Sequence, residues 1–213
     1  MVGTTLGPYE VLAKLGAGGM GVVYRAHDSR LGRDVVIKIL SGEMVTDSTS
    51  LERLKSEARA VAILNHPNIV TIYSVEEYDG VHFITMELIE GRSLAERLRE
   101  GPLPLEPFLD IAIALADALM SVHVKGVTHQ DLKPANLMVE KTGGGETVRI
   151  LDFGIAEAIQ SSRVRRDKGF VGSPHYMPLE QFLNEPFGPP TDLYAVGAIL
   201  YQCVTGKRPH DGK

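Results

Sequence analysis

The feature that most constrains the fold is a change in hydrophobic period near residue 90. Before it, short β-rich runs alternate with turns, at residues 9–15, 22–26, 35–40, 69–75 and 81–86. Beyond it, apolar residues recur at intervals of three and four, which is typical of helices. We therefore predict an α+β chain of two lobes, an antiparallel five-stranded N-terminal lobe over 1–88 and a mainly helical C-terminal lobe over 89–213.

One main helix is predicted inside the N-terminal lobe. Thr49 and Glu52 have the spacing of a capping box, and apolar residues follow at helical intervals until His66-Pro67-Asn68 ends the pattern.

Two longer helices are predicted in the C-terminal lobe. One covers 107–125, with Gly126 where a C-terminal cap belongs, and the other covers 191–205 behind a long irregular stretch, 156–190. The apolar stripe of the first is expected to contain Leu109, Ala112, Ile113, Ala116, Leu119, Met120 and His123.

Composition excludes several classes of function. The chain has 213 residues, 44% of them hydrophobic, and a net charge of -5, so it has no overall attraction to nucleic acid or to an anionic membrane. Its single cysteine, Cys203, cannot form an internal disulfide, which suits a reducing cytoplasm. We expect no targeting segment and no membrane-spanning segment.

A glycine-rich loop and a charged strand are the first candidate functional features. The loop Gly16-Ala17-Gly18-Gly19-Met20-Gly21 lets backbone approach phosphates closely, although a glycine-rich hairpin turn explains it equally well. Lys38 lies inside an apolar strand and requires an anionic partner, for which Glu57 on the predicted helix is the candidate. Taken singly, each is more often an edge charge that reaches water.

Two polar turns supply groups suited to phosphate chemistry. His129-Gln130-Asp131-Leu132-Lys133-Pro134-Ala135-Asn136 brings a carboxylate, an ammonium and an amide together just before a short strand at 137–139. Asp152-Phe153-Gly154 follows a second strand at 148–151, so that its carboxylate emerges at a strand end. A polar loop and a plain turn are the structural alternatives.

The order of these pieces resembles the eukaryotic-type protein kinase family, from about Tyr9 to the C-terminus. The motifs Gly-Ala-Gly-Gly-Met-Gly and Asp-Leu-Lys-Pro-Ala-Asn are most similar to those of the bacterial serine/threonine kinases. The resemblance implies the two-lobed kinase fold, ATP and Mg²⁺ as cofactors, and proteins with Ser or Thr hydroxyls as substrates, with autophosphorylation as an additional reaction. It also implies several further helices beyond Lys213.

By this resemblance, Asp131 would be the catalytic base, Lys133 would stabilise the transferring phosphoryl group, and Asn136 and Asp152 would hold Mg²⁺. Lys38, paired with Glu57, would hold the α and β phosphates. Asp192 would support the catalytic loop. The nucleotide site would comprise Leu15, Gly16, Ala17, Gly18, Gly19, Met20, Gly21, Val22, Val23, Val36, Lys38, Glu57, Met86, Glu87, Ile89 and Met138.

Three departures from the family pattern bear on regulation and binding. Gln130 stands where most members have the arginine that grips a phosphorylated loop, so phosphorylation of residues 155–171 should matter less. Val36 replaces a small alanine above adenine, and Pro178-Leu179-Glu180 replaces Ala-Pro-Glu. A non-catalytic ATP-binding or scaffolding module is therefore the alternative function, and a small-molecule phosphotransferase is a weaker third.

Overall fold

The computed structural model describes residues 1–18, 21–40, 65–143, 145–153, 174–183, 185–186 and 188–209. These residues form two compact units. The N-terminal unit contains the described residues up to Leu40 together with Thr71–Leu88, and the C-terminal unit contains the other described residues. The helix predicted near residues 49–65, with Glu57, lies outside the described residues.

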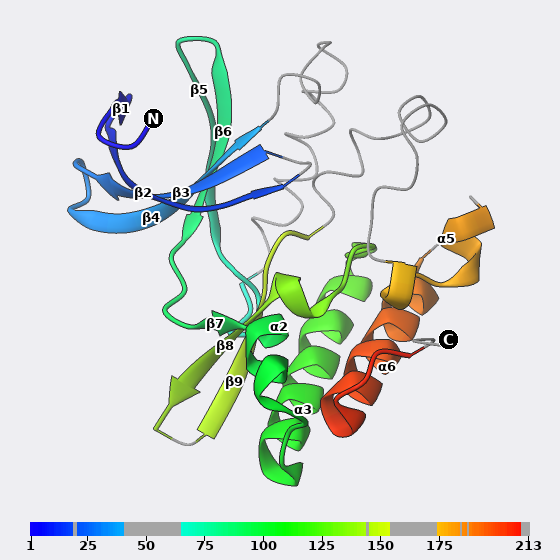
Figure 1. Ribbon diagram of the computed structural model, residues 1–213. Helices are drawn as coiled ribbons and strands as arrows, with labels where there is room; N and C mark the ends of the chain where they lie inside the picture. Colours follow the sequence, from blue (N-terminus) through cyan, green and yellow to red (C-terminus); the bar gives the residue numbers. More distant parts are fainter. Residues whose placement is uncertain are drawn as a thin grey trace. The chain divides into compact units, whose positions relative to one another are not determined.

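A six-stranded antiparallel sheet forms the N-terminal unit, in the order β1-β2-β3-β4-β6-β5 (Figure 1). The five predicted strands are present, and a two-residue strand, β1, is added at one edge. The buried core of this sheet contains Leu6, Tyr9, Ala26, Val35, Ile37 and Phe83. The strands are β1 (Thr5–Leu6), β2 (Tyr9–Gly18), β3 (Gly21–Asp28), β4 (Arg33–Leu40), β5 (Ile72–Tyr78) and β6 (Val81–Glu87).

The range predicted for the fourth strand, 69–75, begins three residues too early, because the observed strand β5 covers Ile72–Tyr78. β5 starts at Ile72 and pairs with β6, whereas Ile69 forms an isolated parallel bridge with Ile150 and Val70 donates its N–H to the Ile150 carbonyl at 3.0 Å. A run of β-branched residues indicates extended backbone but not its partner, so the sequence could not separate the two pairings.

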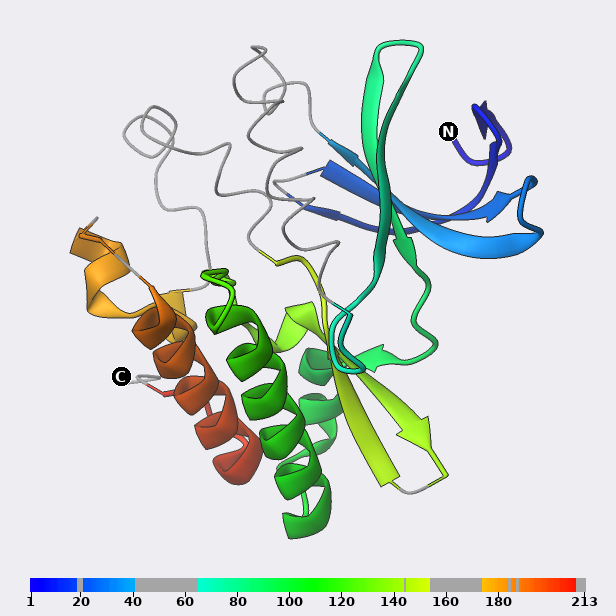
Figure 2. The ribbon, with the colours of Figure 1, turned by 180° about the vertical axis from the view of Figure 1, so that it is seen from behind.

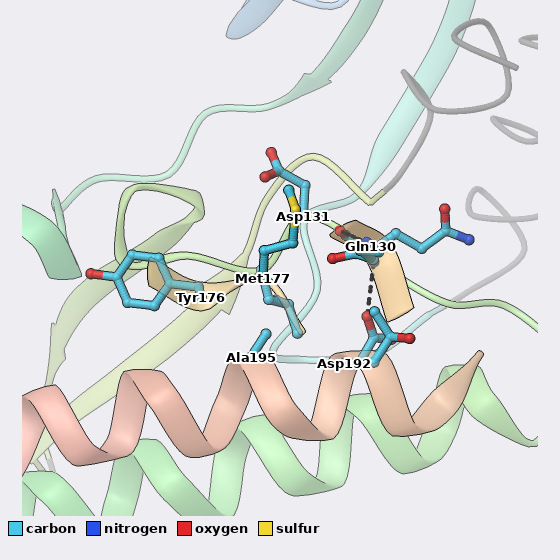
Figure 3. Close-up of a pocket in the computed structure, with 9 residues that line it drawn as sticks. Gln130, Asp131, Tyr176, Met177, Asp192 and Ala195 are labelled. Carbon is cyan, nitrogen blue, oxygen red and sulfur yellow. Dashed lines mark hydrogen bonds between the residues drawn. The ribbon is translucent and has the colours of Figure 1, made fainter. Parts of the chain in front are cut away.

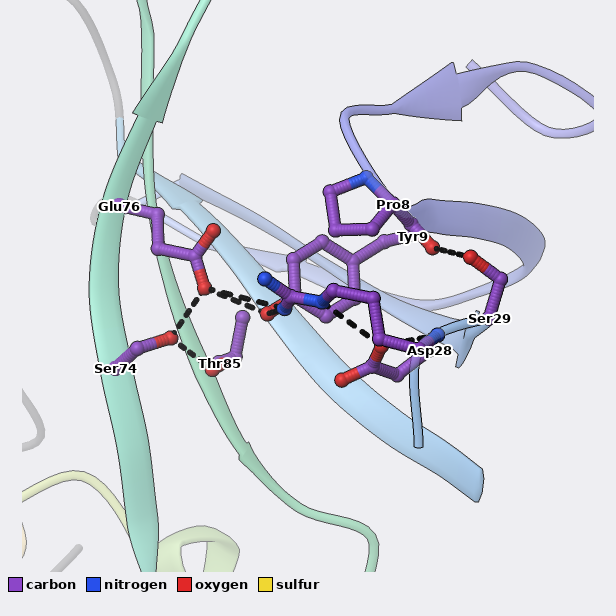
Figure 4. Close-up of polar contacts among 8 residues, drawn as sticks. Pro8, Tyr9, Asp28, Ser29, Ser74, Glu76 and Thr85 are labelled. Carbon is purple, nitrogen blue, oxygen red and sulfur yellow. Dashed lines mark hydrogen bonds and ion pairs between the residues drawn. The ribbon is translucent and has the colours of Figure 1, made fainter. Parts of the chain in front are cut away.

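A polar network joins strands of the N-terminal unit beside the core (Figure 4). The Tyr9 hydroxyl donates to Glu76 Oε1 at 2.6 Å and accepts from Arg30 at 2.5 Å, while Ser74 Oγ donates to the same Glu76 oxygen at 2.6 Å. Arg30 also pairs with the buried carboxylate of Asp28 at 3.3 Å. Burial, followed by the hydrogen bond to Glu76, raises the pKa of Tyr9. The network therefore ties β2 and the β3–β4 turn to β5.

The C-terminal unit is built on two long helices and a small antiparallel sheet, in the order β7-β8-β9 (Figures 1 and 2). Helices α3 and α6 pack side by side, and α3 also packs on β9. Gly206, at φ 69, caps α6 in the left-handed conformation. The elements are β7 (Arg92–Ser93), α2 (Leu94–Arg97), α3 (Leu105–His123), β8 (Leu137–Thr142), β9 (Gly145–Ile150), α5 (Leu179–Leu183) and α6 (Pro189–Thr205).

The predicted apolar stripe of α3 is largely the wrong one. Leu109, Ile113 and Met120 are exposed at 45%, 67% and 63%. Of the residues predicted to form the stripe, Leu119 is buried. The buried face instead consists of Ile111, Leu115, Ala118, Leu119 and Val122. The helix carries apolar residues on two faces, so periodicity alone could not tell which face packs on β9 and α6.

Among the described residues, no helix combines the length and the apolar character needed to cross a bilayer.

Candidate active site

Strand β4 places Lys38 in the middle of the sheet. The residue pairs with Val23 on β3 and with Ile84 on β6, and only 9% of its surface is exposed. Its neighbours Ile37 and Val36 are buried at 0% and 8% exposure. The strand pairing therefore buries a lysine between apolar neighbours along β4, and a buried ammonium group is stable only beside an anion or another hydrogen-bond partner.

The glycine loop is an extension of the β2–β3 hairpin. The pairing runs as far as Gly18 opposite Gly21, three residues beyond the predicted end of the strand, and Gly19 and Met20 lie outside the described residues. Gly21 has φ +134°, and a Cβ there would lie 1.8 Å from the Ile39 carbonyl oxygen. This glycine is thus required by strand packing, whereas a Cβ on Gly16 or Gly18 would meet nothing within 4 Å.

The other predicted nucleotide-site residues lie in both units. In the N-terminal unit, Val36 and Met86 are buried and face each other across β4 and β6, and Val22, Val23 and Glu87 are half-buried. Leu15 and Ala17 are exposed there. In the C-terminal unit, Ile89 and Met138 are half-buried, and Met138 pairs with Ser93 on β7. Each set is therefore placed within its own unit.

The loop 129–136 brings three of the predicted groups together. Lys133 Nζ lies 2.6 Å from Asp131 Oδ2, and the Asn136 side-chain amide donates to the Asp131 carbonyl at 2.8 Å and to Asp131 Oδ2 at 3.3 Å. The 3₁₀ turn Pro134–Asn136 leads directly into β8. Proline fixes the start of this turn, so the carboxylate, ammonium and amide are held by rigid backbone.

His129 connects this loop to the end of β9. Its Nδ1 accepts from the Asp131 N–H at 3.3 Å, so Nε2 carries the ring hydrogen and donates to the Leu151 carbonyl at 2.8 Å. The ring is fully buried against Phe153, with a centroid separation of 4.8 Å. Burial lowers the pKa of His129 below its ordinary value of 6.5, which agrees with the neutral ring that these two contacts require.

Asp192 anchors the same loop from the first turn of α6. Its carboxylate accepts the backbone N–H of His129 at 2.9 Å and that of Gln130 at 2.8 Å, and the residue is 1% exposed. Gln130 has φ 68, a left-handed conformation that costs a non-glycine residue about 1–2 kcal/mol. The hydrogen bonds to Asp192 hold this unfavourable backbone in place.

Figure 3 shows this anchoring, with Asp192 pointing from α6 toward Gln130 while the Asp131 side chain points away from the helix. The residues enclose a cavity of about 10 Å³, which is room for one water molecule at most. The space is a small gap between the loop and the first turns of α6.

Asp152 follows β9 as predicted. It has φ 53, again left-handed, directly after the Leu151 residue that binds both His129 and Asn136. The Leu151 N–H donates to the Asn136 backbone carbonyl at 2.8 Å, so the two predicted metal ligands leave adjacent, hydrogen-bonded segments.

Two contacts of α5 were missed by sequence reasoning. Gln181 Nε2 donates to the Gln130 carbonyl at 2.8 Å, and Thr191 Oγ1 donates to Glu180 Oε1 at 3.1 Å. Gln181 and Gln130 are 51 positions apart and Glu180 and Thr191 are 11 positions apart, and neither pair belongs to a periodic pattern that would have revealed it. The Gln181 contact attaches α5 to the loop 129–136, and the Glu180 contact attaches α5 to the first turn of α6.

Comparison with known proteins assigns the class: the chain belongs to the protein kinase domain family, which matches residues 9–213. Among curated relatives, it is 39% identical to the probable serine/threonine-protein kinase CPE1738 of Clostridium perfringens, over all of this chain and 31% of that protein. It is 36% identical to the serine/threonine-protein kinase PrkC of Bacillus subtilis, over 97% of this chain and 32% of that protein. The chain thus spans about a third of these relatives.

The fold comparison agrees with this class. The crystal structure of the Mycobacterium tuberculosis PknI kinase domain superposes with a TM-score of 0.78 and 27% identity, over 99% of this chain and 79% of that one. The predicted two-lobed kinase fold is therefore confirmed.

Proposed function

We propose that this chain is a protein serine/threonine kinase, which transfers the γ-phosphoryl group of ATP to Ser and Thr hydroxyls of proteins. One observation carries the proposal: the Asp131 carboxylate, the Lys133 ammonium 2.6 Å away and the Asn136 amide are held together by a single rigid turn. The serine/threonine kinases among the relatives support the same function.

Asp131 is suited to act on the attacking hydroxyl. Its carboxylate is 28% exposed, and its backbone is fixed by the bond from Asp131 N–H to His129 and by the bond from Asn136 to its carbonyl. A carboxylate held in this way orients a substrate hydroxyl and accepts its proton as the oxygen attacks phosphorus. Lys133, which reaches the same carboxylate, supplies positive charge where negative charge develops on the phosphoryl group.

The donor set fits Mg²⁺. Asn136 uses its amide nitrogen for both contacts with Asp131, so its amide oxygen remains available to a hard cation. Asp152 brings a carboxylate from the adjoining segment, while among the described residues no group of three or more His, Cys, Asp or Glu side chains is arranged to hold a metal ion. Asn136 and Asp152 would hold the cation, and bound MgATP would supply the phosphoryl group and its charge neutralisation.

The N-terminal unit would bind the rest of the nucleotide. We assign Lys38 to the phosphates, because it is a buried cation on β4. Val36 and Met86 would form the adenine pocket, because they are buried apolar side chains on the neighbouring strands β4 and β6. The backbone of Gly16–Gly21 would cover the phosphates. Protein substrates, with the chain itself among them, are the expected partners.

The test is transfer of radiolabelled phosphate from ATP with Mg²⁺ to a generic basic protein and to the chain itself. We expect Asp131→Asn to lower kcat by at least 1,000-fold while ATP still raises the melting temperature, because the substitution removes the base but not the nucleotide contacts. Glu106→Gln, an exposed carboxylate on α3, is the matched control and should retain full activity.

The outcomes separate the two functions. Phosphoserine or phosphothreonine that disappears in Asp131→Asn supports the kinase. Stabilisation by ATP without transfer from the unaltered chain, with Mg²⁺ or Mn²⁺, would replace it with the non-catalytic binding module.

A further inference from the structure

The carboxylate of Asp192 has a third partner besides the two backbone N–H groups of the catalytic loop. His123, the last residue of α3, places its Nε2 2.8 Å from Asp192 Oδ2. An ionised carboxylate only accepts hydrogen bonds, so the imidazole nitrogen is the donor and carries its hydrogen on Nε2. Sequence periodicity assigned His123 to an apolar stripe, whereas the structure makes it a polar contact to α6.

The contact between His123 and Asp192 is shielded from water. The Asp192 side chain has no exposed surface and the His123 side chain is 14% exposed, so water cannot readily replace the histidine as a donor. Oδ1 receives its bond from Gln130 N–H, and Oδ2 receives bonds from both His129 N–H and His123. Removing His123 would leave each oxygen with one donor, both from the loop itself.

The loop depends on the direction in which that carboxylate points. Gln130 has its left-handed φ of 68, and Asp131 N–H is bound in turn to the ring of His129. A rotation of the Asp192 carboxylate therefore moves the backbone on the N-terminal side of Asp131. Because α3 is packed against β9 and α6, the His123 ring is a fixed external reference for the carboxylate.

We propose that His123 is a positioning residue for phosphotransfer, which acts through Asp192 to hold the 129–131 backbone and thereby the Asp131 carboxylate. The inference rests on the proposed kinase function. It assigns to α3 a part in the reaction although the helix contributes no group to the candidate active site.

Two substitutions test the proposal. His123→Gln keeps an N–H donor near the position of Nε2, whereas His123→Leu removes it. We expect His123→Leu to lower kcat about 10-fold to 100-fold with the KM for ATP changed less than threefold, and His123→Gln to keep kcat within about threefold, because small displacements of a catalytic group have effects of this size.

His66 provides a matched control in the same unit. Its Nε2 lies 3.1 Å from Asp117 Oδ2, so it forms a second histidine–aspartate pair, but the Asp117 side chain is 55% exposed whereas that of Asp192 is fully buried. His66→Leu should leave kcat unchanged at temperatures well below its melting point. A loss of kcat in His66→Leu as large as that in His123→Leu would reduce the effect to general destabilisation and overturn the proposal.

A double-mutant cycle tests the route through Asp192. If His123 acts through that carboxylate, adding His123→Leu to Asp192→Asn should change kcat less than twofold beyond Asp192→Asn alone. Independent, multiplicative effects would contradict the proposal.

Amide hydrogen exchange gives a readout that does not depend on activity. His123→Leu should speed exchange of the His129 and Gln130 amides at least 10-fold, and His123→Gln should restore slow exchange. Unchanged protection of both amides in His123→Leu would overturn the positioning role even in an active enzyme. Absence of phosphotransfer by the unaltered chain would instead count against the proposed function, with the exchange result still interpretable.

Discussion

Strand β4 in the N-terminal unit and the loop 129–136 in the C-terminal unit both hold charged groups in place, but by different forces. Lys38 is positioned by strand pairing on both sides, to Val23 and Ile84, and by buried apolar neighbours. Asp131 is positioned by side-chain hydrogen bonds, and the loop around it is anchored by Asp192, a residue about sixty positions further along the chain. The sheet distributes its support over many backbone bonds, whereas the loop depends on a few side-chain contacts, of which the Asp192 carboxylate accepts two backbone N–H groups.

The largest expected effect follows from removing that carboxylate. Asp192→Ala leaves the N–H groups of His129 and Gln130 and the His123 ring without their acceptor, and each unsatisfied buried donor costs about 1–3 kcal/mol. We expect a loss of about 3–5 kcal/mol in the free energy of unfolding of the C-terminal unit, measured by urea denaturation with circular dichroism.

The same variant also tests whether the loss of stability is confined to the C-terminal unit. Hydrogen exchange of β3, β4 and β6 should be unchanged in Asp192→Ala, because the ladder of the N-terminal unit contains no contact with this carboxylate. Equal loss of protection in that sheet would show that the two supports are not independent.

A smaller loss of stability is expected from a substitution at Gly21, where the sheet has no room for a side chain. Gly21→Ala places a Cβ 1.8 Å from the Ile39 carbonyl at φ +134°, so the Gly21–Leu40 end of the β3–β4 ladder must shift. We expect a cost of about 1–3 kcal/mol in thermal or chemical unfolding.

Gly18→Ala is the control for this substitution, since a Cβ on Gly18 would meet nothing within 4 Å. It should change the free energy of unfolding by less than about 0.5 kcal/mol. Destabilisation of both variants to the same extent would remove the distinction between a packing glycine and a loop glycine.

The smallest effect concerns pH. His129 is fully buried and burial lowers its pKa, so the unfolded chain binds a proton near pH 6.5 that the folded chain does not bind. Its contribution to stability is therefore complete above about pH 6.5 and decreases as the pH falls below that value. Denaturation curves from pH 7.5 to 5.5 should show this decline, and a His129→Asn variant should show less of it.

The sequence was most informative where local pattern determines structure. The strands of the N-terminal sheet, the two long helices and the order of the polar clusters follow from periodicity, turn residues and spacing. The Asp131, Lys133 and Asn136 groups lie within six residues of one another, so their proximity could also be predicted.

Long-range choices could not be read from the sequence. Nothing local indicates that Ile69 pairs with Ile150 instead of joining β5, or which of two apolar faces of α3 is buried. The contacts of His123 with Asp192 and of Gln181 with Gln130 join positions far apart in the chain, and each residue alone has an ordinary polar side chain. The expected roles of Glu57, Gly19 and Met20 lie outside the described residues and stay predictions.

The way in which Gln130 is held limits what a substitution at this position can disturb. Asp192 binds its N–H and Gln181 binds its carbonyl, while its own amide group reaches only as far as Thr128. Both anchors use atoms that every amino acid except proline possesses, so the side chain at this position can be exchanged by a single mutation while the loop keeps its anchors. A change of charge at position 130 would therefore leave both backbone anchors of the loop in place.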